Sequence, residues 1–310
     1  MSSELNPTPT SSRLPLGKAL VESRVLLGGL LALLVLSNIP YGSYILYPFE
    51  LFSTWIHETC HGLAALAVGG SFLELHLYAD TTGRALSRLP NSNTSRVIVA
   101  SAGYIGTTLF GGLLLMLLRP TRFSRSIAGI TIAALLALVV FQVKPWTGIF
   151  LLLLFVGTIA LLAFASPPQD IGQYGLFTLG VLMLATLLYA RSMFTVGALV
   201  LMGGALVAMG IRSSPAVGQF MFSLLAATCG LNALTSINVL FSPNLVVNGQ
   251  RSGASDAHAV AHYLFGSHKL WASLWLVFSA LFLGWALWRS ITAPTLNLAI
   301  DPDKQAPANS

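Results

Sequence analysis

Hydrophobic residues along this chain gather into runs that are long enough to cross a lipid bilayer. A transmembrane helix needs about 20 predominantly apolar residues. The runs that we expect to form membrane helices are Val25–Leu46, Phe49–Val68, Val97–Leu118, Ile127–Ala165, Tyr174–Ala190, Phe194–Ile211, Phe220–Leu240 and Leu270–Trp288. Pro40 and Gly42 interrupt the first run, and because Lys144 and Pro145 interrupt the Ile127–Ala165 run, we expect the latter to form two spans. The pattern therefore predicts an all-α polytopic membrane protein with roughly eight or nine transmembrane helices.

A polar, alternating segment follows the second apolar run. Gly69 and Gly70 end that run, and hydrophobic and polar residues then alternate through much of Ser71–Arg88. Alternation with a period of two is typical of a half-buried β-strand, and Asp80–Gly83 supplies residues that favour a turn. We therefore expect a short β-hairpin directly after the second helix.

Polar segments also set the domain boundaries that we expect. A polar N-terminal tail covers residues 1–24, a membrane-embedded domain covers residues 25–290, and a polar C-terminal tail covers residues 291–310. Within the domain, a second polar interruption lies between Phe241 and Ala257. Ser255 near its end can cap a following helix, which predicts a helix over Asp256–Phe265.

The composition agrees with a membrane protein and excludes an ordinary soluble domain. Hydrophobic residues make up 55% of the 310 residues and charged residues only 8%, whereas soluble domains carry about 25% charged residues. The net charge of +6 is carried by Lys and Arg scattered between the apolar runs. This distribution is typical of loops that set topology and contact lipid headgroups, so we expect no nucleic-acid partner. Cys60 and Cys229 indicate neither a disulfide framework nor a Cys-x-x-Cys metal site.

The main chemical signal is His57-Glu58-Thr59-Cys60-His61 inside the second apolar run. Residues four apart lie on one face of a helix, so His57 and His61 can both reach one Zn²⁺. Glu58 is then placed as the general base that takes a proton from zinc-bound water, the nucleophile. Two histidines and a glutamate are costly in an apolar span unless they bind a metal, pair or face water. The alternative interpretation is a buried polar network that only holds helices together.

A catalytic zinc ion also needs a third protein ligand and an open position for water. Glu50 lies seven residues before His57, so it shares the helix face but lies about two turns away, too far to bind the same metal. Asp256 opens the predicted helix before the last apolar run, and we choose it as the third ligand. A first-turn acid that only stabilises its helix is the competing interpretation of Asp256. His258 and His262, four residues apart, are alternative ligands or ordinary interfacial histidines.

Several segments together resemble the M50 family of intramembrane zinc metallopeptidases, the site-2 protease clan, and within it the compact M50B-like group. The resemblance is carried by Trp55–Ala65 with its His-Glu-x-x-His motif, by Gly69-Gly70 and the extended segment up to Gly83, by Ala102-Gly103-Tyr104-Ile105-Gly106, and by Ser255-Asp256-Ala257 with Trp271 and Trp275 downstream. It covers the chain from about Leu51 to Trp275. One departure from better-known site-2 proteases is that alanine, not glycine, follows the late aspartate.

The resemblance implies a zinc site of His57, His61 and Asp256, with Glu58 as the catalytic general base. It also implies an intramembrane zinc metalloendopeptidase that hydrolyses peptide bonds of membrane-embedded substrates. The 71–88 hairpin is expected to bind the membrane-protein substrate by strand addition. The competing hypothesis is a proteolytically inactive relative that keeps the fold as a membrane scaffold, chaperone or transporter. A transporter should spread polar residues over several spans, whereas here they concentrate near the motif and near Asp256.

Overall fold

The computed structural model describes residues 24–37, 39–118, 122–141, 146–165, 170–247 and 250–292. The helices in this part of the chain are α2 (Arg24–Leu36), α3 (Gly42–Ala67), α4 (Asn93–Leu117), α5 (Arg122–Phe141), α6 (Trp146–Ala160), α7 (Ile171–Ala185), α8 (Met193–Arg212), α9 (Pro215–Thr235), α10 (Ile237–Leu240), α11 (Asp256–Tyr263) and α12 (His268–Thr292). A π-helical turn, η1 (Leu161–Ala165), continues α6, and a 3₁₀ turn, η2 (Thr186–Tyr189), continues α7. The strands of the described residues form two antiparallel pairs, β1 (Ser71–Leu77) with β2 (Gly83–Arg88) and β3 (Asn244–Val247) with β4 (Gln250–Ala254).

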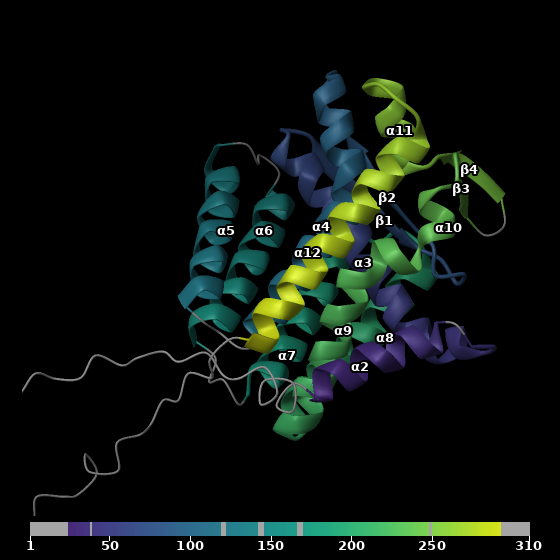
Figure 1. Cartoon of the computed structure of the whole chain (residues 1–310). Helices are drawn as coiled ribbons and strands as arrows, with labels where there is room; N and C mark the ends of the chain where they lie inside the picture. The colour runs from purple at the N-terminus through teal and green to yellow at the C-terminus, as the bar shows by residue number, and fades with distance from the viewer. Residues whose placement is uncertain are drawn as a thin grey trace, which may run out of the picture.

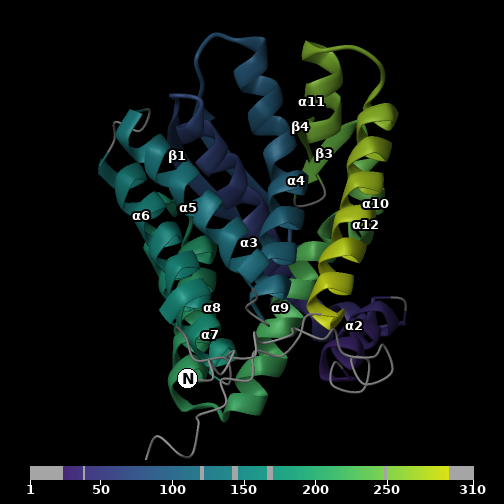
Figure 2. The same cartoon turned by 60° about the vertical axis from the view of Figure 1, so that its left-hand side comes forward.

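Helix α4 lies at the centre of the arrangement that positions the site. It packs against α3, α9, α11 and α12, while the β1–β2 hairpin packs against α3. Figures 1 and 2 show α11 beside the start of α4 at one end of the bundle, with α2 toward the opposite end. Glycines permit the close approach of α4 to α9, since a Cβ on Gly111 would lie 2.3 Å from the backbone nitrogen of Gly230. Elements that are far apart in sequence, α3 and α11, therefore meet on α4.

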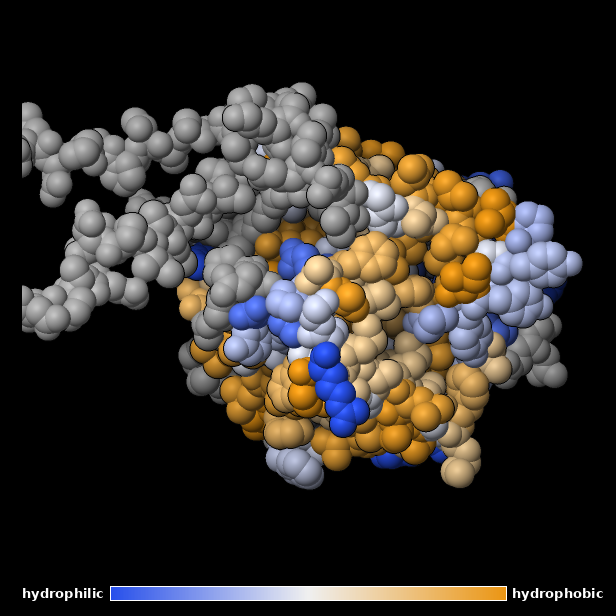
Figure 3. All heavy atoms as spheres, turned by 90° about the horizontal axis from the view of Figure 1, so that it is seen from below, coloured by the Kyte–Doolittle hydropathy of each residue, from blue (hydrophilic) through white to orange (hydrophobic). Residues whose placement is uncertain are grey.

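The described surface is suited to lipid. Large hydrophobic side chains on the long helices are exposed, including Leu201 on α8 and Leu281 on α12, and hydrophobic residues cover much of the described face in Figure 3. Six helices of the described residues are long and apolar enough to cross a membrane: α4, α6 with η1, α7 with η2, α8, α9 and α12. The predicted membrane location is confirmed: the chain is an integral multi-pass membrane protein.

The expected count of roughly eight or nine spans is not confirmed. Two further apolar helices are shorter, Leu27–Leu36 and Arg125–Ala137. The motif helix α3 has 26 residues and is about 39 Å long at a rise of about 1.5 Å per residue. It is not among the six because its polar residues, including the motif, lower its mean hydropathy. The long run that was expected to split does form two helices, α5 and α6.

The predicted boundary between the first two apolar runs is wrong. Helix α2 ends at Leu36, and α3 already begins at Gly42, so the first run does not form one span. Pro40 precedes α3, and Tyr41 adopts a left-handed conformation with a φ of 65°. A Cβ on Gly42 would lie 1.8 Å from the carbonyl oxygen of Leu36. This tight turn, which proline initiates and glycine permits, places the break before the expected position.

The hairpin predicted after the motif helix is confirmed as β1–β2, with Leu75 opposite Ala85 and Leu77 opposite Gly83. The helix predicted to begin at Asp256 is confirmed as α11, which ends at Tyr263. The second strand pair, β3–β4, was not predicted, because β4 (Gln-Arg-Ser-Gly-Ala) lacks an alternating apolar pattern. The polar tails expected at residues 1–24 and 291–310 lie outside the described residues, except at their inner ends.

Candidate metal centre

The motif helix presents His57 and His61 on the face that packs against α4. The two residues are one helical turn apart, and their ring centroids lie 4.8 Å from each other. A Cβ on Gly103 of α4 would lie 2.3 Å from Nε2 of His57 and 2.5 Å from Nε2 of His61. Both Nε2 atoms therefore point into a small space that exists because residue 103 has no side chain.

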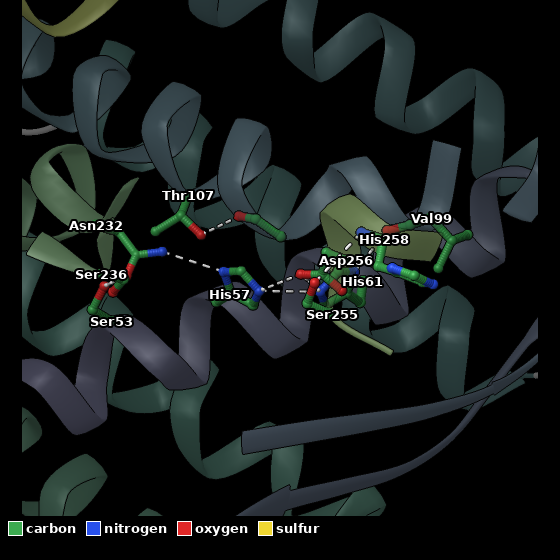
Figure 4. Close-up of polar contacts among 11 residues, drawn as sticks. Ser53, His57, His61, Val99, Thr107, Asn232, Ser236, Ser255, Asp256 and His258 are labelled. Atoms are coloured by element: carbon green, nitrogen blue, oxygen red, sulfur yellow. Dashed lines mark hydrogen bonds and ion pairs between the residues drawn. The ribbon is translucent and has the colours of Figure 1, made fainter. Parts of the chain in front are cut away.

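Asp256 reaches the two histidines from α11, 199 residues after His57. Ser255 caps α11: its hydroxyl oxygen accepts a hydrogen bond from the backbone N–H of His258 at 3.4 Å and donates one to the carbonyl oxygen of Ser242 at 2.6 Å. The cap therefore ties the start of α11 to the preceding loop, and α11 packs on α4. Figure 4 shows the carboxylate of Asp256 directed at the histidines.

Three ligand atoms form a nearly equilateral triangle. Oδ2 of Asp256 lies 3.2 Å from Nε2 of His57 and 3.3 Å from Nε2 of His61, and the two Nε2 atoms are 3.1 Å apart. Ligand atoms about 2.0–2.1 Å from a tetrahedral metal ion lie about 3.3–3.4 Å from each other. The triangle thus fits one face of a tetrahedron, with a fourth position for a water or substrate. Among the described residues, no other group of three His, Cys, Asp or Glu side chains lies close enough to hold a metal.

The carbonyl of Val99 sets the orientation of His61. Nδ1 of His61 lies 2.6 Å from the carbonyl oxygen of Val99, and because a carbonyl can only accept, Nδ1 carries the hydrogen. Nε2 of the neutral ring therefore presents its lone pair toward His57 and Asp256. Metal-binding histidines typically donate their other ring N–H in this way, so His61 is already held in the tautomer that metal binding requires.

Asn232 of α9 has the corresponding contact with His57. Its Nδ2 lies 3.2 Å from Nδ1 of His57, and its Oδ1 accepts hydrogen bonds from Ser53 at 3.2 Å and Ser236 at 3.5 Å. In this orientation Nδ1 of neutral His57 accepts, so Nε2 carries the hydrogen and donates to Asp256. If the amide group of Asn232 is rotated by half a turn, its Oδ1 accepts a hydrogen bond from Nδ1–H of His57. Its Nδ2 then donates to the hydroxyls of Ser53 and Ser236. Asn232 can therefore stabilise the second tautomer too, in which Nε2 is free to bind a metal.

Glu58 is buried, with 7% of its surface exposed, and lies where β2 approaches α3. Its carboxylate accepts a hydrogen bond from the backbone of Ala85. A Cβ on Gly83 would lie 2.7 Å from Cγ of Glu58 and 2.7 Å from Thr54, so only glycine allows the strand to come this close. The hairpin and the motif helix thus hold the carboxylate beside the triad.

A cavity of about 780 Å³ opens onto the triad and Glu58. Several of its other lining residues are charged or polar: Glu50, Thr54, Asp80, Arg84, Arg96, Asn232 and Asn238. Charged side chains within a membrane protein typically face a water-filled cavity. The cavity can therefore bring water to the three ligand atoms through an otherwise apolar bundle.

The alternative ligands do not join the triad. Glu50 lines the cavity but is not part of the metal-ligand group. His258 and His262 are exposed, and the ring of His258 lies 6.0 Å from that of His268. The contact of Asn232 was not predicted, although Asn232 and Asn238 are two polar amides within the apolar run Phe220–Leu240, and such residues were a signal that pointed to it.

Replacing Gly103 with alanine should prevent metal binding, because the new methyl group would fill the space that both Nε2 atoms face. We expect the metal affinity of purified Gly103→Ala protein to fall at least ~10-fold, measured by metal content after dialysis. Gly284→Ala is the matched control, since a Cβ there meets nothing within 4 Å. Wild-type metal content in Gly103→Ala protein would contradict this geometry.

The chain matches the family described as Peptidase M50B-like over residues 26–177 and 169–286. Together these matches include the motif helix, α4, Asn232 and Asp256, and thus every element of the site. No curated protein and no solved structure matches the chain. The matched residues include the whole stretch, from about Leu51 to Trp275, over which the sequence motifs resemble this family. Sequence, fold and site geometry lead to one assignment: the chain belongs to the Peptidase M50B-like family, a family of membrane metallopeptidases.

Proposed function

We propose that this protein is an intramembrane zinc metalloendopeptidase that hydrolyses peptide bonds of membrane-embedded substrates. The triangle of ligand atoms from His57, His61 and Asp256 carries the proposal, because its edges of 3.1–3.3 Å suit a tetrahedral zinc ion. A purely structural polar network has no need of two imidazole nitrogens that face a space kept open by a glycine, with a carboxylate oxygen beside them. The adjacent Glu58 and the polar cavity add a base and a route for water.

Each protein group has a distinct role in the proposed reaction. A bound zinc ion would polarise the substrate carbonyl and lower the pKa of a neighbouring water molecule. Glu58 accepts the proton of the attacking water and later gives it to the leaving amine. The hydrogen bond from Ala85 holds the Glu58 carboxylate in place. Val99 and Asn232 orient the imidazoles through their Nδ1 atoms.

The outer edge of β2, which pairs with no further strand among the described residues, is the surface that we assign to the substrate strand. The outer edge of β1 is already occupied, because Leu75 forms a parallel bridge with Ala190 and the backbone N–H of Leu77 donates to Thr195. The outer edge of β2 faces the cavity, and its residue Ala85 contacts Glu58. An extended substrate that pairs with β2 would lie beside the base and the ligand triad. Strand addition also suits proteolysis, because a helical substrate must unwind before its peptide bond is accessible.

Glu58→Gln protein should bind zinc at wild-type stoichiometry and have no measurable proteolytic activity. Glutamine keeps the size of the side chain but cannot accept the proton of water, and loss of a general base typically costs about 10²–10⁴-fold in rate. The measurement compares membrane proteomes of cells with wild-type and Glu58→Gln protein, together with zinc content. Truncated membrane proteins should occur only with the wild type. Glu50→Gln is the matched control, because Glu50 lies on the same helix outside the triad.

Identical membrane proteomes with wild-type and Glu58→Gln protein would contradict the protease assignment. That outcome would favour the inactive scaffold, chaperone or transporter. Absence of zinc from the purified wild-type protein would contradict the metal assignment separately.

Replacing Ser87 with proline should weaken substrate binding without loss of zinc. Antiparallel pairing alternates the direction of backbone N–H groups, so that of Ser87, like that of Ala85, points away from β1. Proline removes this donor from a free edge, where the strand itself tolerates it. We expect KM to rise several-fold with Ser87→Pro, measured in detergent with a membrane protein that the wild type cleaves as the substrate. Ser87→Ala keeps the N–H and should behave as the wild type; equal KM values for both variants would exclude pairing at this position.

A further inference from the structure

Tyr104 of α4 lies against the metal centre but has no role in the reaction described so far. Only 5% of its surface is exposed. Its ring packs edge-on against the imidazole of His57, with centroids 4.6 Å apart, and stacks on Trp275, with centroids 5.8 Å apart. It follows Gly103 directly, so the same close approach of α3 and α4 fixes its position. Two rings therefore hold the phenol in place.

The hydroxyl of Tyr104 lies at the cavity and has no partner in the described part of the chain. It forms no hydrogen bond with any described residue, and a buried tyrosine hydroxyl usually has one. The buried side-chain polar atoms without a partner in the described residues belong to Ser87, Arg125, Tyr189, Ser213 and Gln219. Tyr104 is not among them, so its hydroxyl oxygen retains accessible surface, and the accessible space that Tyr104 lines is the cavity. The phenol therefore offers a positioned O–H to whatever occupies that space.

Five other hydroxyls that line the cavity are already used as donors, whereas the hydroxyl of Ser87 lacks a partner but its oxygen is buried. The donors and their acceptors are Thr54 to Thr81, Thr228 to Leu224, Thr235 to Leu231, Ser236 to Asn232 and Ser255 to Ser242. The Arg96 guanidinium lies over the ring of Tyr263, 5.0 Å from its centroid. Tyr104 is thus distinguished from these groups by an uncommitted hydrogen next to a metal ligand.

Peptide hydrolysis needs a donor at the carbonyl oxygen, where negative charge develops as water attacks. Fixed donors at this point are often a large contribution to catalysis because they need no reorganisation. We propose that the Tyr104 hydroxyl donates a hydrogen bond to the carbonyl oxygen of the scissile peptide bond and stabilises its developing negative charge. The proposal rests on the proposed peptidase function and assigns one further catalytic residue to it.

The step balances without any further reactant. The water oxygen forms a bond to the carbonyl carbon, the π electron pair moves to the carbonyl oxygen, and Glu58 accepts the water proton. Tyr104 keeps its own proton throughout and strengthens its hydrogen bond as the oxygen becomes negative. When the C–N bond breaks, the electron pair returns to the carbonyl and Glu58 protonates the amine. Tyr104 then donates to the neutral product as it did to the substrate.

Tyr104→Phe separates this role from packing, because phenylalanine keeps both ring contacts and removes only the hydroxyl. With a quenched-fluorescence library of apolar peptides in detergent, we expect kcat to fall on the order of 10²-fold. KM should change little, and zinc content and thermal unfolding should match the wild type. Tyr174→Phe on α7 is the matched control, since Tyr174 lines a separate pocket, and it should keep wild-type kcat.

Wild-type kcat in Tyr104→Phe protein would overturn the proposal and leave Tyr104 a packing residue. A fall in kcat that follows a loss of zinc would overturn it as well, because Tyr104 would then act through His57. If neither wild-type nor Glu58→Gln protein cleaves any peptide, the proposed function fails instead, before Tyr104 is tested.

A second readout does not depend on turnover. An intact library peptide that the wild type cleaves is labelled with carbon-13 at its scissile carbonyl. It is bound to zinc-free Glu58→Gln protein, and separately to zinc-free Glu58→Gln protein that also carries Tyr104→Phe. The carbonyl stretch should lie at lower frequency when Tyr104 is present, because a donated hydrogen bond weakens the C=O bond. Equal frequencies in the two proteins would show that the hydroxyl does not contact this carbonyl.

Discussion

Polar groups buried in a membrane protein are stable only when each has a partner, and this constraint governs the arrangement around His57, His61 and Asp256. Three ligand atoms lie within 3.3 Å of one another, a spacing that is favourable when they share a cation or a proton. The far side of each imidazole is also satisfied, by Val99 on α4 and Asn232 on α9. The packing of four separate helices, α3, α4, α9 and α11, thus depends on one polar cluster.

Close backbone approach explains how this cluster lies beside the strand edge that we assign to the substrate. Gly103 lets α4 approach both imidazoles, and Gly83 lets β2 approach Glu58. These two contacts place Glu58, the three candidate ligands and the outer edge of β2 around one cavity. Tyr104 projects into the same space from the residue beside Gly103. Gly103 is therefore required by the imidazoles that lie against it, and Gly83 by the side chain of Glu58. These contacts explain why glycine occupies the two positions.

Local pattern predicted the elements of the site, and tertiary packing supplied the rest. The spacing of His57 and His61, the hairpin, and the Ser255 cap before Asp256 could all be read from the sequence, because each depends on neighbouring residues. The contact of Asp256 with the motif was only a hypothesis, because α11 is joined to α3 through packing on α4. Val99 acts through its backbone carbonyl, which no sequence motif reveals. The count of roughly eight or nine spans is not confirmed among the described residues, because polar residues lower the mean hydropathy of α3 and two other apolar helices are short.

The central claim is that two imidazole nitrogens and one carboxylate oxygen hold a zinc ion, and X-ray absorption at the zinc edge tests it most directly. Purified protein loaded with one equivalent of zinc should show only light ligands at about 2.0–2.2 Å, with an imidazole contribution from two rings. In Asp256→Ala protein, the light-atom shell should lose one protein ligand. A sulfur ligand at about 2.3 Å, which Cys60 within the motif could supply, or an unchanged shell in Asp256→Ala protein, would contradict the account.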